Sequence, residues 1–215
     1  MDVPDHRMQQ LADLIIPNRI VPTQLEIVDI AGLVKGASKG EGLGNKFLAN
    51  IREVSAVIHV IRCFEDENVL REEGVINPIA DKEIIETELQ LKDLDSVDKK
   101  IQRCEKMAKT DPKAKVELEV LQKCKTHLEQ GKSIRSLDLS KEDRTAIADS
   151  FLLTEKPVMY VANVDEDSVA KGGNAHVDAL RANVAAEHAE VIVVCAALEA
   201  QISEIEDVEE RQMFL

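Results

Sequence analysis

The sequence predicts an α/β fold in which an open, mostly parallel sheet is interrupted by a long helical segment. Four short apolar runs have the composition of buried strands, at residues 25–28, 57–61, 158–161 and 191–195. Between the second and third runs the apolar residues instead recur at helical spacing. Each run ends in a polar or glycine-containing segment, which is where ligands bind in an open parallel sheet.

The helical segment over residues 79–150 is predicted to be an antiparallel hairpin. In its first half, apolar residues recur every three or four positions, at Leu91, Leu94, Val97, Ile101 and Cys104. Asp111-Pro112 then ends the first helix, and the pattern resumes at Leu118, Leu121, Cys124 and Leu128. Gly131 closes the hairpin, and Ser140 caps a further helix. Two ordinary helices of one domain would give the same pattern, but the length and the position between strands favour an insertion.

Composition and charge exclude several classes of protein. With 215 residues and 44% apolar residues, the chain can bury one core and a small satellite. A net charge of −14 argues against nucleic-acid binding over the whole surface. The four cysteines are scattered, which predicts free thiols in a reducing compartment. There is no apolar run of about eighteen residues and no signal-peptide pattern at the start, so a cytoplasmic protein is expected.

A glycine-rich loop follows the first apolar run. Asp29 stands directly after residues 25–28 and Gly32 three residues later, followed by Gly36, Gly40, Gly42 and Gly44. Asp-x-x-Gly alone occurs in many turns. In this context it is typical of the segment with which a nucleotidase senses a terminal phosphate. The Asp holds a water on Mg²⁺, and a glycine N–H can approach a phosphate because no Cβ intervenes.

Two further loops follow the third and fourth runs. Asn163-Val164-Asp165-Glu166 stands where GTPases carry Asn-Lys-x-Asp, but Val164 and Glu166 depart from that motif, which weakens guanine readout. Cys195-Ala196-Ala197 follows the last run, and its small residues would allow a nucleotide base to come close. In isolation an Asn at a strand end is more often a turn former. Its place in the order of strands favours a binding role.

Several segments resemble the YchF family, the Obg-like ATPases of the translation-factor class. The similar segments are residues 29–53, 62–65, 77–79, 160–163 and 199–200. The resemblance implies a P-loop NTPase-like G domain, with a mostly parallel sheet, into which a helical coiled-coil hairpin is inserted. The implied division is residues 1–78 and 151–215 for the two parts of the G domain, with 79–150 as the insertion. It also implies ATP or GTP hydrolysis with Mg²⁺, and association with the ribosome.

The resemblance also assigns roles to individual residues. Asp29 would hold Mg²⁺ through water and Gly32 would sense the γ-phosphate, which makes them the catalytic candidates. The nucleotide-binding candidates are Asn163, Val164, Glu166, Cys195, Ala196 and Ala197. Asn163 would organise its loop, Val164 would contact the base through its backbone, and Glu166 would be a weakened specificity residue. Arg71 stands where the family usually has a His.

Two family elements have no counterpart in these 215 residues. No Gly-x-x-x-x-Gly-Lys-Ser/Thr phosphate loop occurs, and Gly131-Lys132-Ser133 is interpreted as a helix terminus. The resemblance begins after the first switch segment and ends before the TGS domain of the family. We therefore expect an incomplete sheet, a truncated nucleotidase and very weak nucleotide binding by this chain alone. The strand that carries the phosphate loop in the family would lie between the strand ending at Asp29 and the strand containing His59.

A cluster of basic residues surrounds the predicted tip of the hairpin. Its members are Lys99, Lys100, Arg103, Lys106, Lys109, Lys113 and Lys115. Because the whole chain is acidic, this local reversal of charge suggests a phosphate-rich partner such as the ribosome. A solvated helix face explains the pattern equally well. The cluster also supports an alternative function, a non-enzymatic ribosome- or RNA-binding module.

Overall fold

The computed structural model describes residues 1–30, 43–66, 76–187, 189–207, 210–211 and 213. Contacts divide the chain into two compact units, Met1–Gly32 and Leu33–Leu215. The three-part division into residues 1–78, 79–150 and 151–215 remains a prediction.

The N-terminal unit contains helix α1 (His6–Ile15) and extended chain. Asp5 caps α1 by accepting a hydrogen bond from the Arg7 amide at 3.0 Å. One antiparallel bridge joins Asp2 to Gln24.

The prediction of a buried strand at residues 25–28 is wrong in this structure. Leu25, Ile27 and Val28 are 49%, 61% and 48% exposed, and the segment is extended without belonging to a strand. A strand needs a ladder of hydrogen bonds from a neighbour. In the described part of this unit, the backbone hydrogen bonds between the first three residues and this segment involve only Thr23 and Leu25. An apolar run therefore remains exposed where no strand lies beside it.

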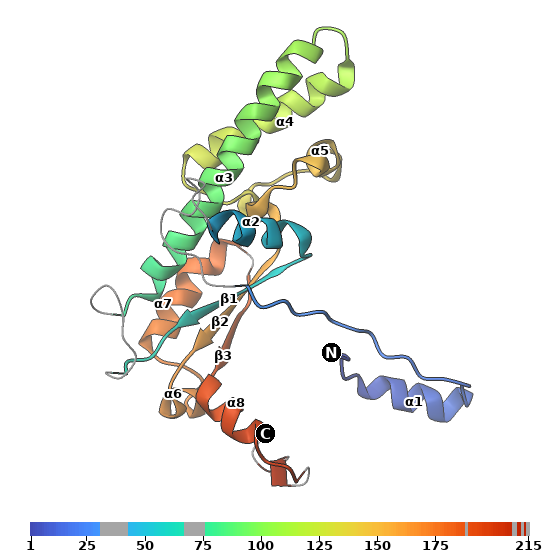
Figure 1. The fold of residues 1–215 in the computed structure, drawn as a ribbon, viewed down its shortest axis with the longest axis vertical. Coiled ribbons are helices and arrows are strands. Elements are labelled where there is room, and N and C mark those ends of the chain that lie inside the picture. The colour runs from blue at the N-terminus through green and yellow to red at the C-terminus, as the bar shows by residue number, and fades with distance from the viewer. Residues whose placement is uncertain (31–42, 67–75, 188, 208–209, 212, 214–215) are drawn as a thin grey trace. The chain divides into compact units, whose positions relative to one another are not determined.

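The second unit contains a three-stranded parallel sheet in the order β1-β2-β3 (Figure 1). The strands are β1 (Val57–Arg62), β2 (Val158–Asn163) and β3 (Val191–Val194). Three of the four predicted strands are thus confirmed. At the carboxyl end of the sheet, Asn163 is aligned with Arg62 on one side and Val194 on the other.

Helices cover one face of this sheet. Helix α6 (Glu166–Ala170), helix α7 (Ala175–Val184) and the 3₁₀ turn η5 (Ala185–Glu187) connect β2 to β3. The buried residues shared by the sheet and α7 are Ile61, Cys63, Tyr160, Ala162, Val164, Val177, Leu180 and Val184. On the opposite face Ile58, Val60 and Ile192 are 44%, 62% and 45% exposed. Among the described residues of this unit, one apolar face of the sheet is therefore covered, and the other, which we call the bare face, keeps exposed apolar side chains.

The predicted helical hairpin is confirmed. It consists of α3 (Pro78–Met107) and α4 (Pro112–Glu129), capped at their starts by Asn77 and Asp111. Proline at the first position of each helix costs no hydrogen bond. Gly131 ends the hairpin at a φ of 70°, a left-handed conformation that favours glycine. Gly131-Lys132-Ser133 is thus a helix terminus, as predicted.

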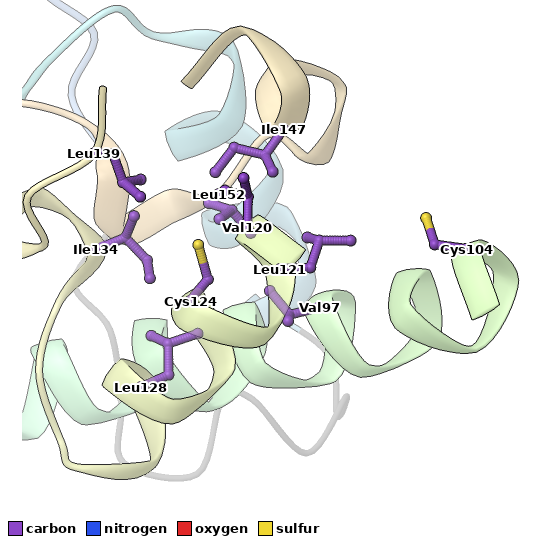
Figure 2. Packing of buried hydrophobic residues seen from close by; sticks show 10 residues of the cluster. All are labelled: Val97, Cys104, Val120, Leu121, Cys124, Leu128, Ile134, Leu139, Ile147 and Leu152. Carbon is purple, nitrogen blue, oxygen red and sulfur yellow. The ribbon is translucent and has the colours of Figure 1, made fainter. Parts of the chain in front are cut away.

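A second core lies between the hairpin helices and the segment that follows them (Figure 2). The segment contains η2 (Ile134–Ser136), α5 (Lys141–Ile147), η3 (Ala148–Ser150) and η4 (Leu153–Glu155). Ser140 caps α5 through a reciprocal pair of bonds with Asp143, as the sequence predicts. The buried residues of this core are Val97, Cys104, Val120, Leu121, Cys124, Leu128, Ile134, Leu139, Ile147 and Leu152. Two further helices, α2 (Leu43–Glu53) and α8 (Ala196–Ser203), flank the sheet segments in the chain.

Candidate functional site

The structure brings the two loops predicted for base recognition together at the carboxyl end of the sheet. The Asn163 side-chain oxygen accepts a hydrogen bond from the Ala196 amide at 3.0 Å. The Asn163 carbonyl accepts one from the Cys63 amide at 2.7 Å, and the Val164 amide donates to the Val194 carbonyl at 2.8 Å. Asn163 therefore connects the ends of all three strands, which is the arrangement expected of a loop organiser.

The residues after Asn163 divide between the core and the surface. Val164 is 2% exposed, so its side chain belongs to the core and only its backbone borders the loop. Asp165 caps α6: its two carboxylate oxygens accept bonds from the Ser168 amide at 2.8 Å and the Ser168 hydroxyl at 3.0 Å. These bonds lower the pKa of Asp165. Glu166 is exposed, as is Asp167 after it, so a ligand can reach the Glu166 carboxylate.

The second loop offers small side chains and backbone. Cys195 is 3% exposed and buries its thiol below the start of α8. Ala196 and Ala197 are exposed, and their methyl groups leave room beside the Asn163 amide. The contact of Glu166, Ala196 and Ala197 with a nucleotide base remains a prediction.

Asn174 is a positioning residue that the sequence analysis missed. Its oxygen caps α7 by accepting from the His176 and Val177 amides at 3.0 and 3.2 Å. Its side-chain nitrogen donates to the Cys63 carbonyl at 2.8 Å and to the Ser168 hydroxyl at 3.1 Å. Asn174 thus ties the loop after β2 to the end of β1. Gly172-Gly173-Asn174 before an apolar helix is a capping signal, but the bond to Cys63 has no signature in the sequence.

The structure does not test the predicted phosphate-sensing residues. Asp29 is exposed in the N-terminal unit, and Gly32 and Arg71 lie outside the described residues. Among the described residues, no group of three His, Cys, Asp or Glu side chains could hold a metal ion. A Mg²⁺ site through Asp29 and its proximity to Asn163 remain predictions.

A buried ion cluster at the base of the hairpin was also missed. Lys82 of α3 pairs with Glu187 of η5 at 2.5 Å, and Arg135 of η2 pairs with Glu86 of α3 at 2.9 Å. Arg135 also reaches Glu187 at 3.3 Å, and the Tyr160 hydroxyl donates to Glu187 at 2.9 Å. Two cations and two carboxylates therefore balance one another between the hairpin, the segment after it and the sheet.

His59 of β1 lies next to this cluster and is half-buried. Burial, followed by the positive charges of Lys82 and Arg135, lowers the pKa of His59 to about 4. Its ring lies 5.7 Å from the ring of Tyr160. His59 is therefore neutral at physiological pH and belongs to the covered side of the sheet.

The structure separates the seven basic residues predicted at the hairpin tip into two groups. Lys99 pairs with Asp95 at 2.7 Å, and Lys100 pairs with Glu117 at 2.6 Å and also with Asp149. The other five are exposed and form no ion pair with the described residues: Arg103, Lys106, Lys109, Lys113 and Lys115.

Comparisons with known proteins decide the family. The profile of the 50S ribosome-binding GTPase family matches residues 9–123. The chain belongs to this family. It is 51% identical over 214 residues to the ribosome-binding ATPase YchF of Escherichia coli O157:H7, covering 99% of this chain and 58% of that protein. It is 50% identical over 217 residues to the ribosome-binding ATPase YchF of Bacillus subtilis, covering 100% of this chain and 59% of that protein.

A solved structure shows the same fold. The Schizosaccharomyces pombe YchF GTPase superimposes with a TM-score of 0.83 at 33% identity, covering 99% of this chain and 58% of that chain. The resemblance to the YchF family and the GTPase-like α/β fold are thereby confirmed. The chain spans less than two thirds of the length of these relatives. None of the helices in the described ranges combines the length and apolar character needed to cross a membrane.

Proposed function

We propose that this protein is a ribosome-associated nucleotidase that binds ATP or GTP with Mg²⁺ and hydrolyses the nucleotide to the diphosphate. The observation that carries this proposal is the bond between Asn163 and the Ala196 amide, which joins two loops at the carboxyl end of a parallel sheet. Open α/β sheets bind their ligands at this end. The relatives named ribosome-binding ATPases support ribosome association, and with it a place in the cytoplasm.

In this proposal the two loops hold the base. Asn163 keeps the loops together, the Val164 backbone and the two exposed alanines contact the ring, and Glu166 faces its polar edge. The buried Cys195 positions the start of α8. Mg²⁺ would supply charge neutralisation at the phosphates, with Asp29 holding it through water and Gly32 contacting the γ-phosphate.

The loop also bears on base selectivity. Asp165 is occupied by Ser168, so Glu166 is the exposed acid next to the base position. Its extra methylene removes the fixed geometry with which a shorter Asp accepts two bonds from guanine. We infer relaxed discrimination between adenine and guanine nucleotides.

An NMR titration of the ¹⁵N-labelled chain with MgATP and MgGTP tests the proposal. We expect weak binding, because these residues contain no phosphate loop, with shift changes concentrated at the amides of 163–166 and 195–197. Asn163→Ala should abolish these changes. Asn50→Ala, an exposed Asn of α2, is the matched control and should leave them intact. Tight binding, or shift changes confined to other regions, would contradict the proposed site.

A second candidate function is a non-enzymatic ribosome- or RNA-binding module. The five exposed cations at the hairpin tip that form no ion pair with the described residues favour it and would provide the contact: Arg103, Lys106, Lys109, Lys113 and Lys115. Co-sedimentation with ribosomes separates the two functions. A nucleotidase switch should bind or release according to the nucleotide, whereas a simple module should bind equally with ATP, ADP or neither.

A further inference from the structure

Asn174 forms hydrogen bonds that the capping of α7 does not require. A helix cap needs a side-chain oxygen, which Asp or Ser supplies as well as Asn. Here the oxygen serves the His176 and Val177 amides. The side-chain nitrogen instead donates to the Cys63 carbonyl at 2.8 Å and to the Ser168 hydroxyl at 3.1 Å. Of the residues that cap helices well, only Asn carries an amide nitrogen with two hydrogens, so these two bonds explain why residue 174 is Asn.

The bonds continue from Asn174 to the acidic residue beside Glu166. Ser168 is buried, and its single hydroxyl hydrogen is donated to the Asp165 carboxylate at 3.0 Å. The hydroxyl oxygen is therefore the acceptor of the bond from Asn174. The other Asp165 oxygen accepts from the Ser168 amide at 2.8 Å, so both carboxylate oxygens are held. A hydrogen-bond relay thus runs from Asn174 through Ser168 to Asp165, the residue that precedes Glu166.

Asn174 also fixes the beginning of this loop. The Cys63 carbonyl accepts from Asn174, and the Cys63 amide donates to the Asn163 carbonyl at 2.7 Å. This residue at the end of β1 is therefore held through both of its backbone polar groups. The segment between β2 and α6 (Figure 1) is anchored at Asn163 and again at Ser168. Glu166 lies between these two points, so its exposed carboxylate is carried by a backbone that is fixed on both sides.

A turn that favours glycine brings Asn174 to this position. Gly172 and Gly173 have φ values of 77° and 139°, in the region that L side chains rarely adopt. A Cβ at Gly173 would lie 3.2 Å from a methyl carbon of Val177, which is closer than ordinary van der Waals contact. The Gly173 amide donates to the Ser168 carbonyl at 2.9 Å and holds the turn against α6. The connection between α6 and α7 therefore returns residue 174 to the residues that it bonds.

We propose that Asn174 positions the Glu166 carboxylate against the amino group at the polar edge of a purine base. It acts through the relay and does not itself touch the ligand. A carboxylate on a fixed backbone loses less conformational entropy when it accepts a hydrogen bond than one on a mobile loop. The proposal rests on the proposed nucleotide function, and it names the residue that sets how strongly the loop prefers a base with an amino group.

NMR titration of the ¹⁵N-labelled chain with two nucleosides tests the proposal, read at the amides of residues 163–168. Adenosine carries the amino group, and purine riboside is the same nucleoside without it. The test variant Asn174→Asp keeps an oxygen for the α7 cap and removes both donor bonds. Asn77→Asp is the matched control, because Asn77 caps α3 by accepting from the Ala80 amide at 3.1 Å. Asn174→Asp should weaken adenosine binding about five- to tenfold and purine riboside binding less than about twofold, whereas the control should change neither.

A second variant, Ser168→Ala, tests the relay. It interrupts the path between Asn174 and Asp165 and leaves the α7 cap and the bond to Cys63 in place. We expect the same selective loss of adenosine affinity. The variant that combines Ser168→Ala with Asn174→Asp should lose no more than either alone, because both changes break one path.

Several outcomes would overturn the proposal. Unchanged adenosine affinity in Asn174→Asp would exclude a positioning role. Equal weakening of both nucleosides would show that the loop has lost its structure and that Glu166 is not selectively affected. Additive losses in the combined variant would exclude the relay. Failure of the proposed function has a different signature, since the unchanged chain would then bind neither nucleoside at residues 163–168, and that result would overturn both proposals.

Discussion

The base and the tip of the hairpin use the same kinds of charged residue in opposite ways. At the base, the side chains of Lys82, Glu86, Arg135 and Glu187 are between 8% and 14% exposed, and every charge meets its opposite. At the tip, five exposed cations meet no carboxylate among the described residues. A buried charge must be paired because its desolvation is costly, whereas an exposed one is free to serve a partner. The comparison separates charges that join the hairpin to the sheet from exposed charges that form no ion pair with the described residues.

The largest expected effect comes from opening the ion cluster at the base. Arg135→Leu leaves the carboxylates of Glu86 and Glu187 buried with too little positive charge. We expect the free energy of unfolding in urea to fall by about 3–5 kcal/mol. Arg144→Leu is the control, since Arg144 is 41% exposed and its pair with Glu155 at 3.2 Å should contribute less than ~1 kcal/mol. Equal losses in the two variants would show that the cluster has no special role.

Acidification should lower the free energy of unfolding through His59, which lies beside the same ion cluster. Its pKa is about 4 in the folded chain and about 6.5 when unfolded, so the unfolded state binds more protons between these values. The stability contribution is fully present above pH 6.5 and is lost as the pH falls toward 4, by about 3 kcal/mol. Urea unfolding of the wild type and of His59→Gln across this range checks the sign. The variant should lose less stability on acidification than the wild type.

The smallest effect is expected at the tip and has the opposite sign. Lys113→Glu replaces a cation at the amino end of α4 by an anion, which should stabilise the fold by about 0.3–1 kcal/mol while weakening RNA binding. Lys123→Glu, at an exposed position inside the same helix, lacks this end effect and should give no gain. Thermal unfolding resolves the difference. A loss of stability in Lys113→Glu would mean that the lysine supports the fold after all.

Much of the fold could be predicted because local patterns match local causes. Strands β1, β2 and β3 could be predicted because each contains a run of apolar residues. The hairpin could be predicted because its apolar residues recur at helical spacing and this spacing is interrupted at Asp111-Pro112. Residues 25–28 carry the same apolar signal, yet they remain exposed. Whether a run becomes a strand depends on a neighbour that the run itself does not encode.

The loops of the candidate site could be located from the sequence in the same way. Asn163 ends β2 and Cys195-Ala196-Ala197 directly follows β3, so both lie beside apolar runs that predict strands. Their direct hydrogen bond could not, and neither could the tie from Asn174 to Cys63, 111 positions away. Lys82 and Glu187 are 105 positions apart and pair only once the sheet and hairpin have assembled. Contacts of this kind arise from three-dimensional packing, so a single sequence contains no sign of them.

The bare face of the sheet has a practical consequence. This face exposes the branched apolar side chains of Ile58 and Val60 of β1 and of Ile192 of β3 to solvent. Water wets such a plane poorly, so this face favours self-association of the chain at high concentration. It does so together with other exposed apolar side chains, among them Leu14, Ile15 and Ile16.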